Sequence, residues 1–340
     1  MTIAMMETNN HMAELWQQLE NEKVVGLVKR LYSSEINFHI YATFKYPESF
    51  FGIAFNFSNN IKIDISNFDN LRDLKVLLLD DTSYVNTKLL IVELLHSTSK
   101  DVFAVLCENL ILSVIQLDSE QKFIRAVINQ LNKWKTLFDK SASDALSNEQ
   151  QQGLYGELVF LHKCLMQQDV NSLKVLNTWV GVDSALRDFQ YSTWAVEVKT
   201  TATNNPQKVA INGERQLDET LLDNLFLFHC SVEVFNGNGE TLNQKIEKIR
   251  LLLESNIVAL NVFNLKLFEV GYFDSHANKY EKRCYKVRSE NYHRITDDFP
   301  RIKENELRSG VSGVRYDIIL AMCDEYLITE NQLLNTIQNL

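Results

Sequence analysis

The sequence predicts an α/β protein in two parts, an N-terminal α+β domain over residues 1–143 and a C-terminal domain with a mixed sheet over residues 144–340. The short polar stretch Lys140-Ser-Ala-Ser143 separates two successions of helical and strand-like patterns. Hydrophobic residues make up 45% of the chain, and only three prolines and eleven glycines occur, so both parts can form a core without long disordered linkers.

The N-terminal part begins with an amphipathic pattern that predicts a helix over residues 12–30. Strand-like segments follow at 36–44, 50–57, 61–66 and 74–79, and the Asn59-Asn60 turn predicts that residues 50–66 form a hairpin. Helical patterns then cover about 87–97, 101–115 and 119–139. No recognisable chemistry lies in this half.

The C-terminal part opens with Ser147, which fits a helix N-cap because Gln150 can complete a capping box. Strands are expected at about 186–191, 194–200, 207–211 and 224–235, and a helix at 241–254. In residues 224–235 both faces are apolar, as in the central strand of a covered sheet. The order is helix, antiparallel strands, mixed central sheet, helix.

The most informative segment is the strand that contains Glu197-Val-Lys199. Trp194, Val196 and Val198 alternate with Ala195 and these two polar residues, so an acid and a lysine share one face, roughly 6–7 Å apart along the strand. Asp188 lies nine residues upstream of Glu197, and a hairpin would return it to the same end of the sheet. Such a set can hold Mg²⁺ and orient a water against a phosphodiester. The alternative is a solvated edge strand without chemistry.

Two other acid-x-lysine triplets show that the spacing is not specific by itself. Asp73-Leu-Lys75 also has an acid, Asp64, nine residues upstream, and Glu120-Gln-Lys122 is the third triplet. Asp73 and Lys75 lie at a strand entry, and Glu120 and Lys122 open a polar-faced helix, so water is available at both places. Only Glu197 has apolar strand residues on both sides.

Glu157 lies in an unusually apolar helix. Leu154, Leu158, Leu161 and Leu165 form one stripe, and Glu157 lies at its edge. A carboxylate there is costly unless it is paired or binds a cation, so either an internal salt bridge or a third metal-site acid is expected. Gly153 and Gly156 would allow a strand or a substrate backbone to approach this helix closely.

Composition narrows the class of protein further. The five cysteines are far apart and form no Cys-x-x-Cys, which argues against zinc and disulfides and for buried thiols in a reducing compartment. An oxygen-rich site favours Mg²⁺ or Mn²⁺. No signal-peptide pattern and no run of eighteen apolar residues occurs, so a cytoplasmic protein without membrane contact is expected. No phosphate loop, dinucleotide fingerprint or nucleophile elbow supports a metabolic enzyme.

The net charge of −10 opposes simple nucleic-acid binding. Between Lys279 and Arg315, however, ten basic residues stand against six acids, with tyrosines interleaved. Either a solvated hairpin or a phosphate-contacting surface is expected there. The candidate nucleic-acid contacts are Lys282, Arg283, Lys286 and Arg288.

Several motifs in order resemble the bacterial PD-(D/E)XK motif proteins, which are restriction-endonuclease-like and associated with phage-defence and restriction-modification loci. They are Gly153–Leu161, Trp179-Val-Gly181, Asp188-Phe189, Glu197-Val-Lys-Thr-Thr201, Gln216-Leu-Asp218, Val270-Gly-Tyr272 and Gly313–Leu320. The resemblance covers roughly residues 146–330. Arg187 stands where the family usually has a proline before the first acid.

The resemblance implies a restriction-endonuclease-like α/β/α core in residues 144–340 and a set of site residues. Glu157 corresponds to the helix acid, Asp188 to the first strand acid, Glu197 and Lys199 to the terminal pair, and Gln216 to a recurring glutamine. Asp188 and Glu197 would bind Mg²⁺ or Mn²⁺ with the backbone carbonyl of Val198, and Glu157 would complete the shell. Lys199 would orient the attacking water.

The expected function is Mg²⁺-dependent hydrolysis of DNA in a bacterial anti-phage or restriction system. The alternative is a non-catalytic or partner-activated defence subunit that uses the same fold to bind DNA or a protein. Candidate partners are DNA, co-encoded defence proteins such as an ATPase or a methyltransferase, and a further copy of the chain.

Overall fold

The computed structural model describes residues 11–337 except 70, 72, 97–99, 116, 144, 169, 182–185, 204–206 and 238. The chain divides into two compact units, Met1–Asp144 and Ala145–Leu340. Within the described residues no helix is long and apolar enough to span a membrane. All five cysteines are buried and free, as predicted.

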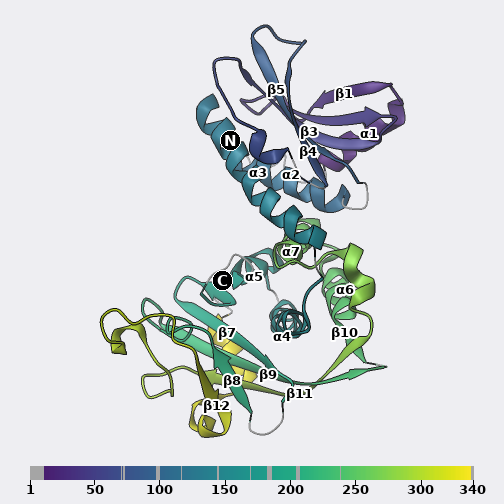
Figure 1. Cartoon of the computed structure of the whole chain (residues 1–340). Coiled ribbons are helices and arrows are strands. Elements are labelled where there is room, and N and C mark those ends of the chain that lie inside the picture. The colour runs from purple at the N-terminus through teal and green to yellow at the C-terminus, as the bar shows by residue number, and fades with distance from the viewer. Residues whose placement is uncertain are drawn as a thin grey trace. The chain divides into compact units, whose positions relative to one another are not determined.

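Unit 1 is an antiparallel five-stranded sheet with helices (Figure 1). The strand order is β1-β2-β3-β5-β4. Its elements are α1 (His11–Glu22), β1 (Gly26–Leu31), β2 (Ile40–Tyr46), β3 (Phe50–Ser58), β4 (Leu74–Asp80), β5 (Thr87–Leu94), α2 (Lys100–Val114) and α3 (Glu120–Ser143). Trp16 of α1 stacks on Phe103 of α2 and donates its indole N–H to the carbonyl of Gly52, so helices and sheet share one core.

Three predicted elements of this unit are wrong. The helix expected over 12–30 ends at Glu22, because Lys23 and Gly26 have positive φ and the chain turns into β1. Residues 61–66 form no strand, since β3 already pairs with β2 and β5. The helix expected at 87–97 is the strand β5, which is buried between β3 and β4 and therefore reads as a continuous apolar run.

Unit 2 contains the mixed sheet that the sequence predicts. Its order is β10-β11-β9-β7-β6, with β13 paired to β11. β7 and β9 are parallel, whereas β6–β7 and β9–β11 are antiparallel. The strands of this sheet are β6 (Phe189–Tyr191), β7 (Trp194–Thr201), β9 (Asn224–Asn236), β10 (Glu240–Thr241), β11 (Arg283–Arg294) and β13 (Leu327–Ile328). A separate antiparallel pair consists of β8 (Lys208–Ile211) and β12 (Tyr316–Ile319).

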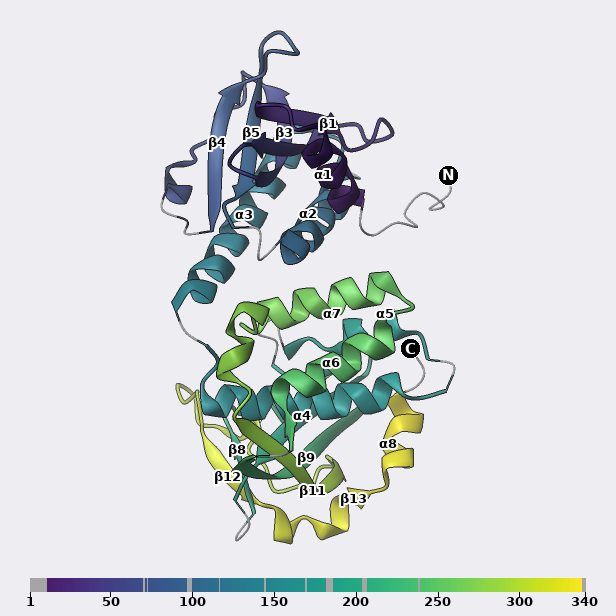
Figure 2. The ribbon, with the colours of Figure 1, turned by 90° about the vertical axis from the view of Figure 1, so that its right-hand side faces the viewer.

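Helices cover one face of this sheet. They are α4 (Asn148–Leu165), α5 (Ser172–Thr178), α6 (Leu242–Leu253), α7 (Ile257–Glu269) and α8 (Glu330–Ile337). Their apolar residues share a core with Val196, Val198, Phe226 and Phe228. Figures 1 and 2 show α4, α6 and α7 on one side of the sheet and the β8–β12 pair on the other. The capping box of Ser147 and Gln150 is present at the start of α4, as expected.

The second face of the sheet has a smaller core. Ala195, Leu225 and Leu227 pack there against β8, β12 and the segments around them, including Leu217 and Phe299. The two faces of β9 are therefore both apolar, which confirms the prediction of a central strand. The α/β class and the mixed sheet are confirmed, and the strands at 186–211 were predicted to within a few residues.

Candidate active site

Glu197 and Lys199 lie on the face of β7 that Ala195 shares, opposite the face that α4 covers. The side chain of Glu197 is only 2% exposed, and its Oε1 accepts from Lys199 Nζ at 2.7 Å. Its Oε2 is buried and has no hydrogen-bond partner among the residues that the structure describes. The alternative of a solvated edge strand is therefore wrong for Glu197.

Asp188 immediately precedes β6, the strand that pairs with the start of β7. Phe189 pairs with Val196, so one further step of this register places Asp188 opposite Glu197. Asp188 Oδ2 accepts from the backbone N–H of Val198 at 2.7 Å, and the carbonyl of Asp188 accepts from Val180 and Gly181, both at 2.9 Å. Gly181 is needed here, because a Cβ would lie 2.9 Å from Asp188 Oδ1 and 3.0 Å from its Cα.

The N–H of Val198 points toward Asp188 and away from β9. In a strand the N–H and C=O of one residue point to the same side. The carbonyl of Val198 therefore lies on the Asp188 side of β7, and β6 pairs only with residues 194–196 of this strand. This backbone oxygen is not used in the pairing of β6 with β7.

Glu157 reaches the site from α4, on the helix-covered side of the sheet. Gly156 brings this helix against β7, because a Cβ at this position would lie 1.7 Å from Thr200 Oγ1. A Cβ at Gly153 would meet no atom of the described residues within 4 Å, so no strand approaches the helix there. Glu157 Oε2 accepts from the indole N–H of Trp179 at 2.7 Å. Its hydrogen-bond partner is thus an indole, where a salt bridge had been the alternative.

The three carboxylates interact electrostatically. Burial, together with the negative charge of Asp188, raises the pKa of Glu157 to about 8 and that of Glu197 to about 8. Burial also raises the pKa of Asp188, against the hydrogen bond from Val198 and the charge of Lys199. Closely spaced buried acids resist ionisation in this way unless a cation neutralises them.

The acids are neighbours without forming a finished metal cage. Among the described residues no three His, Cys, Asp or Glu side chains are arranged as a ready metal-binding group. The donor set nevertheless suits Mg²⁺ or Mn²⁺, since it consists of carboxylates and a backbone carbonyl that β6 does not pair. The buried, unpartnered Oε2 of Glu197 also fits a cation, because nothing in the described structure satisfies it.

Gln216 lies on the segment between β8 and β9. Its Oε1 accepts from the backbone N–H of Asn212 at 2.9 Å and from Lys199 Nζ at 3.4 Å. The ammonium of Lys199 therefore has oxygen partners on both Glu197 and Gln216. Sequence reasoning named Gln216 but missed Trp179 as the partner of Glu157; the Trp179-Val-Gly181 motif was the available signal.

The four candidate nucleic-acid residues lie in or just before β11, which the sequence analysis did not assign as a strand. Lys282 and Lys286 are exposed. Arg283 donates to Tyr285 and Gln152, and the guanidinium of Arg288 donates to the carbonyls of Ala202 and Val232. The contact of these residues with nucleic acid stays a prediction.

The unit has a mixed sheet with helices on one face. Beside β7 it gathers Asp188, Glu197 and Lys199, together with Glu157 from α4. This combination defines the PD-(D/E)XK class of fold. A family model described as "Putative PD-(D/E)XK family member, (DUF4420)" matches residues 12–321. The chain belongs to this family. No curated protein and no solved structure gives a significant match.

Proposed function

We propose that this protein is a metal-dependent endonuclease that uses Mg²⁺ or Mn²⁺ to hydrolyse phosphodiester bonds, with DNA as the substrate. The observation that carries the proposal is the buried carboxylate of Glu197, with one oxygen on Lys199, the other without a partner, and the charges of Asp188 and Glu157 beside it. Most buried polar atoms have a hydrogen-bond partner, so this unpartnered oxygen beside two further acids needs an explanation, and a bound cation supplies one.

The residues have distinct tasks in this proposal. Asp188, Glu197 and the carbonyl of Val198 would hold the ion, and Glu157 would join them directly or through a water. A bound ion lowers the pKa of coordinated water and neutralises charge on the phosphate. Lys199 orients the attacking water and donates to the phosphate as negative charge develops there. Trp179 keeps one oxygen of Glu157 directed by its indole N–H.

The family resemblance supports a role in bacterial anti-phage defence or restriction, in the cytoplasm. The acidic balance of the chain supports a second candidate, a subunit that needs a partner to reach its substrate. That partner would be a co-encoded ATPase or methyltransferase, or a further copy of the chain. In this case the same fold binds DNA or protein and cuts only when the partner is present.

One assay separates these proposals. Supercoiled plasmid, linear DNA and RNA are incubated with the protein and Mg²⁺, Mn²⁺ or EDTA, alone and with its co-encoded proteins. The stand-alone endonuclease predicts metal-dependent cleavage by the wild type and none by Glu197→Gln. Asp73→Asn is the matched control, because Asp73-Leu-Lys75 repeats the same spacing outside the site.

Cleavage only with a partner supports the second candidate. Equal cleavage by purified wild type and Glu197→Gln would show that the activity does not depend on Glu197 and would refute the site. Titration with Mn²⁺ gives an independent result, since Glu197→Gln should lose binding whether or not a substrate has been found. Unchanged Mn²⁺ binding by that variant would refute the metal site.

A further inference from the structure

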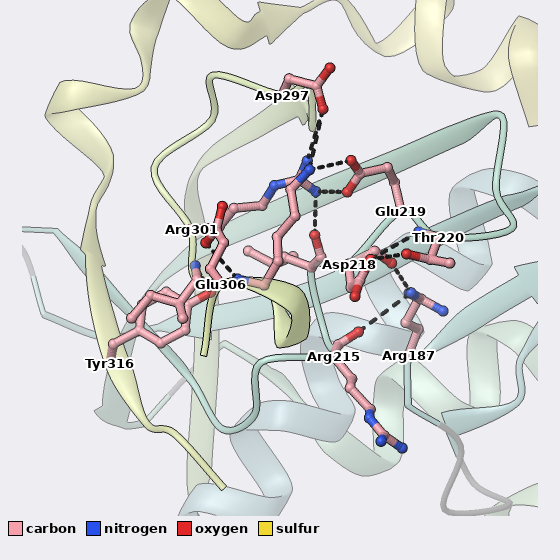
Figure 3. A network of polar contacts seen from close by, with 12 residues as sticks. Arg187, Arg215, Asp218, Glu219, Thr220, Asp297, Arg301, Glu306 and Tyr316 are labelled. Carbon is pink, nitrogen blue, oxygen red and sulfur yellow. Dashed lines mark hydrogen bonds and ion pairs between the residues drawn. The ribbon is translucent and has the colours of Figure 1, made fainter. Parts of the chain in front are cut away.

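Two buried arginines hold the loop that carries Gln216. We call residues 212–220, between β8 and β9, the Gln216 loop. Figure 3 shows Arg187 and Arg301 directed at this loop from two sides, with Arg215, Asp218 and Glu219 among their partners. Arg187 comes from the segment before β6, and Arg301 from the segment between β11 and β12.

Arg187 is 7% exposed and directly precedes Asp188. Its guanidinium donates to the carbonyl of Arg215 at 3.4 Å and to the carbonyl of Asp218. The positive charge of Arg187 also lies close enough to Glu197 to oppose the rise of its pKa. One side chain therefore connects the acid cluster with the backbone of the Gln216 loop.

Arg301 binds the same loop from the other side, and its side chain is only 1% exposed. Its guanidinium donates to the carbonyl of Leu217 and forms an ion pair with Glu219 Oε2 at 2.5 Å. Lys303 binds Glu219 Oε1 at 2.6 Å. The charge of Arg301 is thus balanced within the loop, which reduces the cost of burying it.

These contacts fix the backbone on both sides of one residue. The carbonyl before Gln216 belongs to Arg215 and is bound by Arg187, and the carbonyl of Leu217 after it is bound by Arg301. The planar guanidinium, with several N–H donors in fixed directions, is suited to hold backbone carbonyls in this way. The side chain of Gln216 is then directed back to Asn212 N–H and Lys199 Nζ.

We propose that Arg187 and Arg301 are positioning residues that act through Gln216 to hold the ammonium of Lys199 beside Glu197. The inference rests on the proposed function for its catalytic consequence. The ammonium of Lys199 is attached through a flexible methylene chain, and its three N–H donors have no preferred direction. Two fixed oxygens, on Glu197 and Gln216, leave its third N–H for a water or a phosphate oxygen.

The test compares Gln216→Ala, Arg187→Gln, Arg187→Lys, Arg301→Gln and the double variant Arg187→Gln/Gln216→Ala with the wild type. Arg215→Gln is the matched control, because it removes an arginine side chain of the same loop whose ion pair with Glu304 is more than half exposed. Exposed pairs of this kind contribute little to stability. Folding of each variant is verified by its melting temperature and circular dichroism.

The first readout does not need activity. Hydrogen–deuterium exchange of peptides over residues 212–220, and the rate at which an acylating reagent modifies Lys199, are measured by mass spectrometry. Arg187→Gln and Arg301→Gln should each raise both rates roughly tenfold, since local opening of the loop becomes easier. Arg187→Lys should restore part of the protection, and Arg215→Gln should leave both rates at the wild-type value. Lys248, on α6, serves as the internal reference for acylation.

The second readout is kinetic. Gln216→Ala and Arg187→Gln should each lower kcat by up to roughly 10²-fold, as for a misplaced catalytic group, with little change in KM. Because both act on Lys199 through one path, the double variant should lose no more than the worse single variant. Additive losses, or wild-type exchange and acylation in folded Arg187→Gln, would overturn the inference. A wild type that stays inactive even with its co-encoded proteins refutes the proposed function and leaves the exchange and acylation results to decide the positioning role.

Discussion

Gly156→Ala offers the sharpest test of how α4 presents Glu157. A Cβ at this position would lie 1.7 Å from Thr200 Oγ1, 3.0 Å from its Cβ and 3.3 Å from its Cγ2. Rotation of the threonine about χ1 cannot remove the contact, since its Cβ stays at 3.0 Å and threonine is stiff at this angle. To reach an ordinary contact of 3.4 Å, helix and strand must separate by about 0.4 Å if the threonine rotates and by about 1.7 Å if it does not.

The matched control is Gly153→Ala on the same helix, because a Cβ there meets nothing within 4 Å. Both changes give a similar gain in helix propensity, about 1 kcal/mol. The difference in unfolding free energy between the variants therefore reports the clash alone. We expect Gly156→Ala to be the less stable of the two by about 1–3 kcal/mol, as for overpacking in a core.

The same displacement moves Glu157 away from Asp188. A shift of about 1 Å at a catalytic group can cost roughly 10²-fold in rate, so Gly156→Ala should lose at least that much activity and Gly153→Ala none. Urea unfolding and plasmid cleavage measure the two effects, and Mn²⁺ titration replaces cleavage if a partner is required. Thr200→Ala in the Gly156→Ala background should recover part of the lost stability and part of the lost activity. Equal stability and metal binding of the two glycine variants would refute the proposed contact between α4 and β7.

Three further predictions concern charge. Asp188→Asn should abolish metal-dependent cleavage without lowering the melting temperature of the metal-free protein. Asparagine keeps an oxygen that accepts from the Val198 N–H, and it removes a charge that repels the other acids. If the variant unfolds, Asp188 is instead a structural ion-pair partner. With EDTA, the free energy of unfolding should fall as pH rises from about 4.5 to 8, since the folded protein holds protons on Glu157 and Glu197 that the unfolded chain has released. Melting curves at a series of pH values measure this dependence, and Mg²⁺ should reduce the loss of stability at high pH. If stability depends on pH equally steeply in Glu197→Gln, the prediction is wrong. Lys282→Glu with Lys286→Glu should weaken DNA binding by a factor that shrinks at high salt, measured by fluorescence anisotropy with Ca²⁺ in place of Mg²⁺; no effect at low salt would remove this surface from consideration.

The candidate site was predictable where its signals are local. Period-2 alternation identified β7, and the nine-residue spacing of Asp188 and Glu197 matched the hairpin of β6 and β7. Glu157 was found because a carboxylate in an apolar helix needs an explanation. In unit 1 the same method failed at β5, since a strand buried on both faces has no alternation to distinguish it from a buried helix.

Long-range partners could not be inferred from spacing. Trp179 and Glu157 are 22 residues apart, and Arg187 and Asp218 are 31 apart, so only the fold brings them together. The raised pKa values of the acids also depend on burial by elements distant in the chain. Residue type alone gave no reason to expect that an arginine before Asp188 would be buried.

Arg187 shows how the segment before the first acid can be restrained without a proline. A proline before the first acid restricts the backbone through its fixed φ and lacks an N–H. In this chain the carbonyl of Asp188 is instead held by the N–H groups of Val180 and Gly181, and the side chain of Arg187 is tied to the carbonyls of Arg215 and Asp218. The segment before β6 is thus restrained by hydrogen bonds in place of a ring. Unlike a proline, the arginine also couples the acid strand to the Gln216 loop, so a change at residue 187 should reach Lys199 through Gln216.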